Sequence, residues 1–296
     1  MFFLVVWFTL RAARYVPAFS LALMSVAIPV FHANAADAPM TMTPPNSGGI
    51  SFQSVGELAQ DSTGPRLGNA EIADPTEWRA SFYSKSTGHG CTSTLIGPQT
   101  LLTAAHCVGP GQEASIKVEG VPYSGACIHH PDYPTDPSAD YALCRMTQPV
   151  PGVPYESINT NPKALKVGMY LRLTGFGCVS ISGTGPVDDI YRVGNSPVTA
   201  LPGELPHEPN SIITTATVVE DAILCRGDSG GPAFIESDMS SARVVASVNS
   251  RVSPSQRRSY MSSLTTDKAM AWIKQWSDFA VEQRICGLPN APDGCR

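Results

Sequence analysis

The most informative segment of the chain is a glycine-rich turn, Cys225-Arg226-Gly227-Asp228-Ser229-Gly230-Gly231-Pro232. Glycine has no side chain, so the backbone on either side of Ser229 can approach a ligand closely. Successive backbone N–H groups in such a turn can converge on a single anion. A serine hydroxyl placed there becomes a nucleophile only when a base lies beside it. The segment therefore indicates nucleophilic catalysis and requires a partner base elsewhere in the chain.

A candidate base lies in the segment Leu101-Leu102-Thr103-Ala104-Ala105-His106-Cys107. Histidine suits a general base because its ordinary pKa lies near neutrality. The small residues before His106 leave space around its imidazole ring. A carboxylate must hold the other ring nitrogen, and Asp140 is the candidate because it begins the apolar run Asp140-Tyr141-Ala142-Leu143. Asp132 and Asp136 are alternatives, but both lie among prolines in an expected loop.

Together these segments resemble the T-A-A-H-C, D-x-A-L and G-D-S-G-G-P motifs of the trypsin-like (chymotrypsin-fold) serine proteases, in that family's order. The spacing also fits the family, with 34 residues from His106 to Asp140 and 89 from Asp140 to Ser229. The resemblance covers roughly residues 67–275 and implies two six-stranded antiparallel β-barrels with a C-terminal α-helix. Independently, many short β-rich runs and one helical pattern, from Thr266 to about Arg284, predict an all-β barrel or sandwich.

The resemblance also implies a role for each motif residue. His106 acts as general base and then general acid, Asp140 orients it, and Ser229 attacks the scissile carbonyl. The backbone N–H groups of Gly227 and Ser229 form the oxyanion hole. We expect a monomeric serine endopeptidase that acts on protein or peptide substrates and needs no cofactor or metal. Two other hypotheses stay open: a catalytically silent protease-fold binding protein, and an esterase-like acyl hydrolase.

By the same resemblance, a floor, a rim and a wall of the substrate pocket are expected from Ile223, Leu224, Arg226, Ser247, Val248 and Asn249. Ile223 lies six residues before the serine, where the family has its pocket floor. An apolar floor without a carboxylate favours an apolar P1 side chain over Arg or Lys. Arg226 is expected at the rim, where it can attract acidic groups. The wall is expected from the stretch Ser247-Val248-Asn249-Ser250, which departs from the family's S-W-G, so its register is open.

The N-terminal residues 1–35 are expected to be a secretory signal peptide. Two apolar runs, Met1–Leu10 and Tyr15–Phe31, precede the small-x-small sequence Ala33-Asn34-Ala35. A membrane anchor is the alternative, but the second run has only 17 residues and contains two prolines. We expect a secreted protein, extracellular or periplasmic, with no stable membrane association after the signal is removed.

Residues 36–66 are rich in Pro, Thr, Ser, Gly and Met, which predicts a pro-segment or linker rather than core. The family resemblance implies a zymogen that is cut between Arg66 and Leu67, freeing an ammonium group that pairs with Asp228. The following Leu67-Gly68-Asn69-Ala70 resembles a weakened I-V-G-G. The protease domain is expected to consist of barrel 1 at about 67–165, barrel 2 at about 166–265, and a helix and tail at 266–296.

The chain has eight cysteines, at positions 91, 107, 127, 144, 178, 225, 286 and 295. An even number in a secreted chain predicts four disulfides. A zinc site is disfavoured because no C-x-x-C pair is present. The family resemblance pairs Cys91 with Cys107 and favours Cys178 with Cys225. The remaining expected pairs are Cys127 with Cys144 and Cys286 with Cys295, one arrangement among the roughly 105 that eight cysteines allow.

The composition excludes several other classes of protein. Of the 296 residues, 43% are hydrophobic and 15% are charged, which supplies a full core and argues against disorder. The formal net charge is −5 and there is no basic block, so nucleic acid is not an expected partner.

Overall fold

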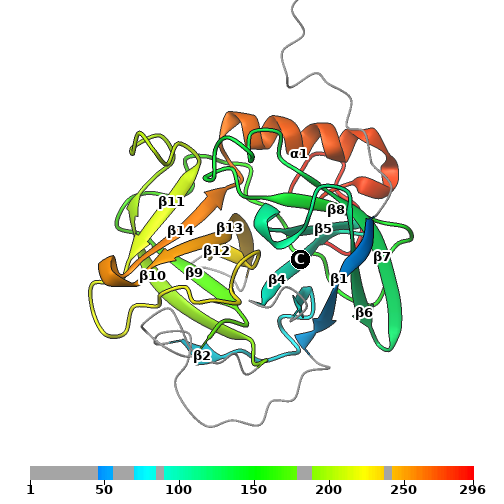
Figure 1. Cartoon of the computed structure of the whole chain (residues 1–296), viewed down its shortest axis with the longest axis horizontal. Helices are drawn as coiled ribbons and strands as arrows, with labels where there is room; N and C mark the ends of the chain where they lie inside the picture. The colour runs from blue at the N-terminus through cyan, green and yellow to red at the C-terminus, as the bar shows by residue number, and fades with distance from the viewer. Residues whose placement is uncertain (1–45, 56–69, 85–89, 179–188, 237–241) are drawn as a thin grey trace, which may run out of the picture.

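A computed structural model describes residues 46–55, 70–84, 90–178, 189–236 and 242–296. These residues form two β-barrels that lie side by side, and the helix α1 runs along the first of them (Figure 1). The predicted signal peptide and the Arg66–Leu67 bond lie outside the described residues. Among the helices of the described residues, none has the length and apolarity needed to cross a membrane.

The first barrel is closed by seven strands in the order β1-β3-β4-β5-β8-β7-β6. In chain order they are β1 Asn46–Ser54, β3 Ser81–Ser84, β4 Cys91–Gly97, β5 Thr100–Thr103, β6 Gln112–Val118, β7 Val121–His129 and β8 Ala142–Met146. All residues of β3, β4 and β5 are buried, because these strands pack against the second barrel as well as their own core. Because β5 is buried along its whole length, the end of the strand that precedes His106 is held in place.

The second barrel has six strands in the order β11-β14-β13-β12-β9-β10 and is closed by pairing between β11 and β10. Its strands are β9 Tyr170–Gly175, β10 Arg192–Ala200, β11 Ser211–Thr215, β12 Pro232–Glu236, β13 Arg243–Ser253 and β14 Arg258–Ser263. The short strand β2, Glu71–Ile72, adds to the outer edge of β10.

The predicted two-barrel fold is confirmed, but the first barrel has one strand more than expected. The additional strand is β1, which lies within residues 36–66 and corrects the expectation that this segment stays outside the core. Ile50 and Phe52 are buried while Ser51 and Gln53 are exposed. This alternation is the pattern of a half-buried strand, and it is too short to stand out among the surrounding polar residues.

The helix α1, Asp267–Phe279, follows the second barrel and packs back against the first. Thr266 caps it, because its side chain accepts a hydrogen bond from the backbone N–H of Ala269. Trp276 is fully buried and donates from Nε1 to Thr100 Oγ1 of β5 at 3.0 Å. The helix is shorter than predicted, because the backbone becomes extended at Ala280 before a 3-10 turn, Val281–Gln283.

Four disulfides join the eight cysteines, and all four expected pairs are confirmed. The Cys91–Cys107 bond links β4 to the turn that carries His106. The Cys178–Cys225 bond links the segment after β9 to the start of the serine turn. Two of the four cross-links therefore hold the backbone that carries the predicted catalytic residues.

Candidate active site

The three motif residues come from the ends of strands in both barrels. His106 lies in a 3-10 turn, Ala105–Cys107, directly after β5. Asp140 lies two residues before β8, and Ser229 lies in the turn that precedes β12. The first barrel therefore supplies the histidine and the aspartate, and the second barrel supplies the serine.

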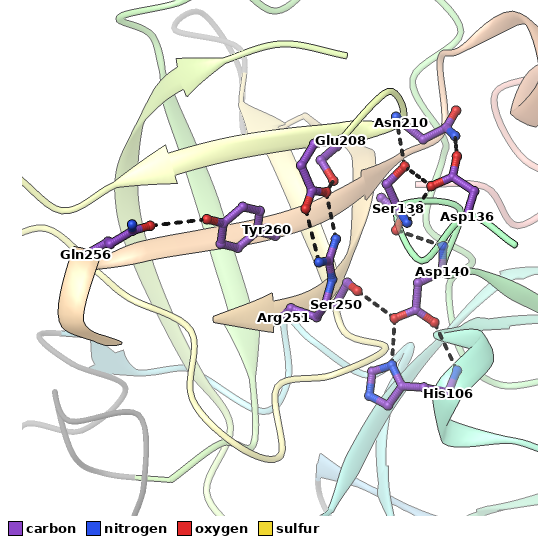
Figure 2. A network of polar contacts seen from close by, with 12 residues as sticks. His106, Asp136, Ser138, Asp140, Glu208, Asn210, Ser250, Arg251, Gln256 and Tyr260 are labelled. Carbon is purple, nitrogen blue, oxygen red and sulfur yellow. Dashed lines mark hydrogen bonds and ion pairs between the residues drawn. The ribbon is translucent and has the colours of Figure 1, made fainter. Parts of the chain in front are cut away.

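Asp140 holds His106 through two hydrogen bonds (Figure 2). Its Oδ2 lies 2.6 Å from His106 Nδ1, and its Oδ1 accepts from the His106 backbone N–H at 2.9 Å. Ser250 Oγ donates to the same Oδ2 at 2.6 Å. Burial acts to raise the pKa of Asp140, but the hydrogen bonds and positive charge of His106 and the Ser250 hydroxyl outweigh it, so the pKa is lowered. The carboxylate can thus orient the imidazole while staying ionised.

The two alternative aspartates have other partners. Asp132 accepts from Lys268 Nζ at 2.7 Å on the exposed side of α1. Asp136 Oδ1 accepts from Ser138 Oγ at 2.6 Å, and its Oδ2 accepts from Asn210 Nδ2 at 2.8 Å. Asp136 therefore anchors the loop before Asp140 to the second barrel (Figure 2). This anchoring differs from the mobile loop that the prolines suggested, and it steadies the backbone that carries Asp140.

The turn around Ser229 depends on two glycines with left-handed backbone. Gly227 has φ of 102° and Gly230 has φ of 83°, conformations that other residues seldom adopt. A Cβ atom on Gly230 would lie 2.2 Å from the carbonyl oxygen of Thr92, so only glycine fits. Within the described part of the chain, the backbone N–H groups of Gly227 and Ser229 have no acceptor. Free backbone N–H groups on the serine and two residues before it are donors of the kind that can bind an oxyanion.

Thr92 fastens the serine turn to the first barrel, a role that the sequence did not reveal. Its backbone N–H donates to the carbonyl of Ser229 at 2.6 Å, and its Oγ1 donates to the carbonyl of Gly227 at 2.8 Å. Cys107 Sγ lies 3.8 Å from His106 Nε2 and 3.7 Å from the Ser229 carbonyl oxygen, so histidine and serine face the same disulfide. No direct hydrogen bond joins the His106 ring to Ser229 Oγ among the described residues. Such bonds commonly tighten only when substrate is bound.

The family model described as Trypsin matches residues 68–273 of this chain. The chain belongs to the trypsin family. The match spans both barrels except for β1 and reaches the start of α1, so it includes His106, Asp140 and Ser229.

Individual trypsin-family relatives are more distant. The chain is similar to the snake venom serine protease Haly-2 of Gloydius brevicauda, at 29% identity over 59% of this chain and 74% of the relative. It is similar to tryptase of Mus musculus at 36% identity, over 25% of this chain and 32% of tryptase. The serine proteinase stubble of Drosophila melanogaster is 27% identical over 52% of this chain. The match spans only 23% of the length of stubble and 32% of the length of tryptase, so most of each of these two proteins lies outside the aligned region.

A cavity of about 230 Å³ lies beside the serine of this trypsin-family site. It is lined by Leu224, Cys225, Arg226, Ser229, Ser250, Arg251 and Val252. Of the predicted substrate-binding residues, the structure places Leu224 and Arg226 at this cavity, whereas Ile223, the expected floor, is buried and does not line it. Ser247, Val248 and Asn249 lie instead within the sheet, paired with β12 and β14. Three of the four expected wall residues therefore lie away from the cavity, and the fourth, Ser250, lines it.

Arg251 is a cavity residue to which the sequence alone assigned no role, whereas Ser250 is the last residue of the expected wall. Arg251 forms a two-point ion pair with Glu208, with Nη1–Oε1 at 3.1 Å and Nη2–Oε2 at 2.7 Å, and its guanidinium lies 5.3 Å from the ring of Tyr260 (Figure 2). Ser250 donates to Asp140, so it contacts the predicted triad as well as the cavity.

Asp228 lies beneath the serine turn and is fully buried. Its Oδ1 accepts from the Gly177 backbone N–H at 2.7 Å, and its Oδ2 accepts from the Cys225 N–H at 2.8 Å. Burial raises the pKa of Asp228 to about 7, although these two hydrogen bonds and the positive charge of Arg192 act in the opposite direction. An additional cation nearby would stabilise the ionised form of this carboxyl group and lower its pKa.

Proposed function

We propose that the chain is a secreted serine endopeptidase that works through an acyl-enzyme. The observation that carries the proposal is the His106–Asp140 pair, together with a glycine-rich turn in which the backbone N–H groups of Gly227 and Ser229 have no acceptor among the described residues. A soluble binding protein has no need for this arrangement. The four disulfides agree with an oxidising compartment, which supports secretion.

In the proposed reaction, Ser229 Oγ attacks the peptide carbonyl carbon and gives its proton to His106 Nε2. The N–H groups of Gly227 and Ser229 stabilise the negative charge on the carbonyl oxygen, which is worth on the order of 10²–10³ in rate for each donor. The C–N bond then breaks, and His106 protonates the leaving amine. Water attacks the resulting ester by the same steps, with His106 as base, and releases the acid. Asp140 holds the imidazole throughout and stabilises its charged form.

The sheet edge beside the serine favours a peptide as substrate. β12 pairs with β13 only as far as Val248, whereas β13 continues to Ser253. Residues 250–252, beyond this pairing, line the cavity beside Ser229. An extended peptide can lie along such an edge as an added strand, with main-chain hydrogen bonds to both sides of the bond to be cut.

Turnover of two substrates tests this proposal against the alternatives. The chain cut between Arg66 and Leu67 should hydrolyse both an unfolded protein and a small ester. The Ser229→Ala variant, cut in the same way, should hydrolyse neither. Hydrolysis of the ester alone would identify an esterase-like acyl hydrolase. Failure with both substrates, in a folded chain that has been cut, would identify a silent binding protein.

The proposed P1 preference is apolar. Peptides that differ only at P1 should give kcat/KM values at least about tenfold higher for Leu or Phe than for Lys or Arg. The reason is that Leu224 and Val252 line the cavity and that Arg226, also in its lining, repels a cation. The charge of the other lining arginine, Arg251, is balanced by Glu208.

Two charge-reversed variants complete that measurement. Arg226→Glu should raise kcat/KM for Lys and Arg peptides relative to Leu peptides. Arg258→Glu makes the same change on an exposed strand residue outside the cavity and should leave the ratio as it was. A wild-type preference for Lys or Arg would contradict the assignment, and a preference for Asp or Glu would show that the arginines outweigh the apolar lining.

We also propose that the chain is a zymogen activated by cleavage between Arg66 and Leu67. Ala70, the fourth residue after the cut, is buried, and β2 pairs with β10 at Arg192, whose charge acts on Asp228. The first described residues after the cut therefore lead directly to the strand whose arginine acts on Asp228. An ammonium group paired with this buried carboxylate would fix the serine turn, because Asp228 directly precedes Ser229.

The raised pKa of Asp228 predicts a specific pH dependence for the uncut chain. The carboxyl has a pKa near 3.8 when unfolded and about 7 when folded, so between these values only the folded chain keeps the proton. The free energy of unfolding should therefore fall as the pH rises from about 4 to about 7, by at most about 4 kcal/mol. Urea denaturation across this range should show the fall reduced in Asp228→Asn.

The same urea experiment is repeated on the chain cut between Arg66 and Leu67. Once an ammonium group pairs with Asp228, the carboxyl pKa drops and the cut chain should lose this part of the pH dependence. Identical slopes for the wild type and Asp228→Asn would show that Asp228 does not titrate as described. A slope that is unchanged after cleavage would contradict the proposed ion pair.

A further inference from the structure

The strand β1 closes the first barrel by filling the space between β3 and β6. It pairs in parallel with β6 through residues 50–53 and antiparallel with β3 through Gln53 and Ser54. No direct pairing between β3 and β6 is found among the described strands. Without β1, each of these two strands would present an unpaired edge, and the barrel would be open.

The inner face of β1 is part of the barrel core. Ile50 and Phe52 are 2% and 0% exposed, and Val55, directly after the strand, is 1% exposed. They pack in one cluster with Phe82 of β3 and Ile116 of β6. Packing and strand pairing of this extent hold the segment by the same forces as the rest of the core. The attachment of β1 therefore does not depend on the covalent chain that follows it.

The proposed cut between Arg66 and Leu67 lies after β1 in the chain. No disulfide can tether the segment, because all eight cysteines lie at residue 91 or later and are paired with one another. We infer that the segment containing β1 stays in the slot between β3 and β6 after cleavage, so that the mature enzyme consists of two chains held together without a covalent link. This inference rests on the proposed cut but not on the proposed peptidase activity.

The test is the fate of the N-terminal fragment after a controlled cut. The recognition sequence of a site-specific protease replaces residues 61–66 in the full chain, with Ser229→Ala to prevent self-digestion. After the cut, native size-exclusion chromatography should elute both fragments together in equal amounts, as identified by intact mass, and denaturant should separate them. Elution of the small fragment on its own overturns the inference, whether the large fragment stays folded or aggregates.

Two neighbouring substitutions show whether the strand is what holds the fragment. Phe52→Ala should weaken retention roughly 10²–10³-fold, measured by exchange against a labelled synthetic copy of the fragment. Gln53→Ala alters the exposed neighbour on the same strand and should stay within about threefold of wild type. Equal retention in the two variants would contradict the inference.

A milder substitution and a natural sample complete the design. If Phe52→Ala does not fold before the cut, Ile50→Val should weaken retention about 2–10-fold in the same direction. Because the readouts are fragment masses and elution, the retention of β1 can be tested even when the enzyme is inactive. The masses of the naturally secreted chains report the natural cut separately, so failure of the zymogen proposal and failure of strand retention give different results.

Discussion

Replacing Ser229 with alanine is expected to lower kcat for peptide hydrolysis by a factor on the order of 10⁶. Losses of this size are typical when the nucleophile of a Ser-His-Asp enzyme is removed, because the histidine and aspartate then have no hydroxyl to activate. The remaining donors at Gly227 and residue 229 leave a rate about 10³–10⁴ above that of water. Single-turnover and steady-state assays on the cut chain, with one defined peptide, measure the loss.

A matched serine makes that result specific. Ser255 is exposed in a 3-10 turn, Pro254–Gln256, and Ser255→Ala should keep kcat within about twofold of wild type. Circular dichroism and the urea midpoint should show that both variants are folded. Residual activity of Ser229→Ala within tenfold of wild type would mean that Ser229 is not the nucleophile.

Replacing Asp140 with asparagine is expected to lower kcat by about 10⁴ near neutral pH. The carboxylate now accepts from the His106 ring N–H at Nδ1, whereas an asparagine amide can present its own N–H there and stabilise the wrong tautomer. Since Ser250 Oγ donates to the same oxygen, the amide also leaves that hydroxyl without its acceptor. KM should change little, because Asp140 is 2% exposed and does not line the cavity.

The control for Asp140 comes from the same loop. Asp132 pairs with Lys268 on the exposed side of the helix, and Asp132→Asn should keep kcat within about twofold of wild type. If Asp140→Asn stayed within tenfold of wild type, or if Asp132→Asn fell as far as Asp140→Asn, Asp140 would not be the residue that orients His106.

Short motifs made the catalytic core of this molecule predictable. Residues such as Gly230 tolerate no other side chain, so the turn around Ser229 leaves a recognisable pattern in the sequence. The disulfide between Cys91 and Cys107 follows from the same resemblance, because it holds the turn that carries His106. Asp140 could be chosen over its neighbours, but its bond from Ser250 was visible only in three dimensions.

The additional strand of the first barrel, β1, could not be predicted because strand pairing is a non-local property. In β1, buried and exposed residues alternate only over a short stretch around Phe52. Its partner β6 is distant in the sequence, because β3, β4 and β5 lie between them. A short apolar alternation among Ser, Gly and Asn residues does not differ from linker sequence until its partner is known.

Three residues of the expected pocket wall, Ser247, Val248 and Asn249, lie away from the cavity for a different reason. The pairing of β13 with β14 shifts register between Asn249 and Arg251, where a bulge redirects the strand. Ser250 lies at this shift and turns toward Asp140, so the residues that follow it reach the cavity. Sequence spacing alone, with two serines three residues apart, does not locate such a bulge.

The most direct test of the account is the intact mass of the secreted, cut protein before and after treatment with a fluorophosphonate probe. The account predicts one covalent adduct, located by peptide mapping on Ser229, lost in Ser229→Ala and formed far more slowly in Asp140→Asn. The same spectrum gives the N-terminus of the larger chain, expected at Leu67. A folded protein that begins at Leu67 and forms no adduct, or that still forms one in Ser229→Ala, would contradict the proposed serine peptidase mechanism.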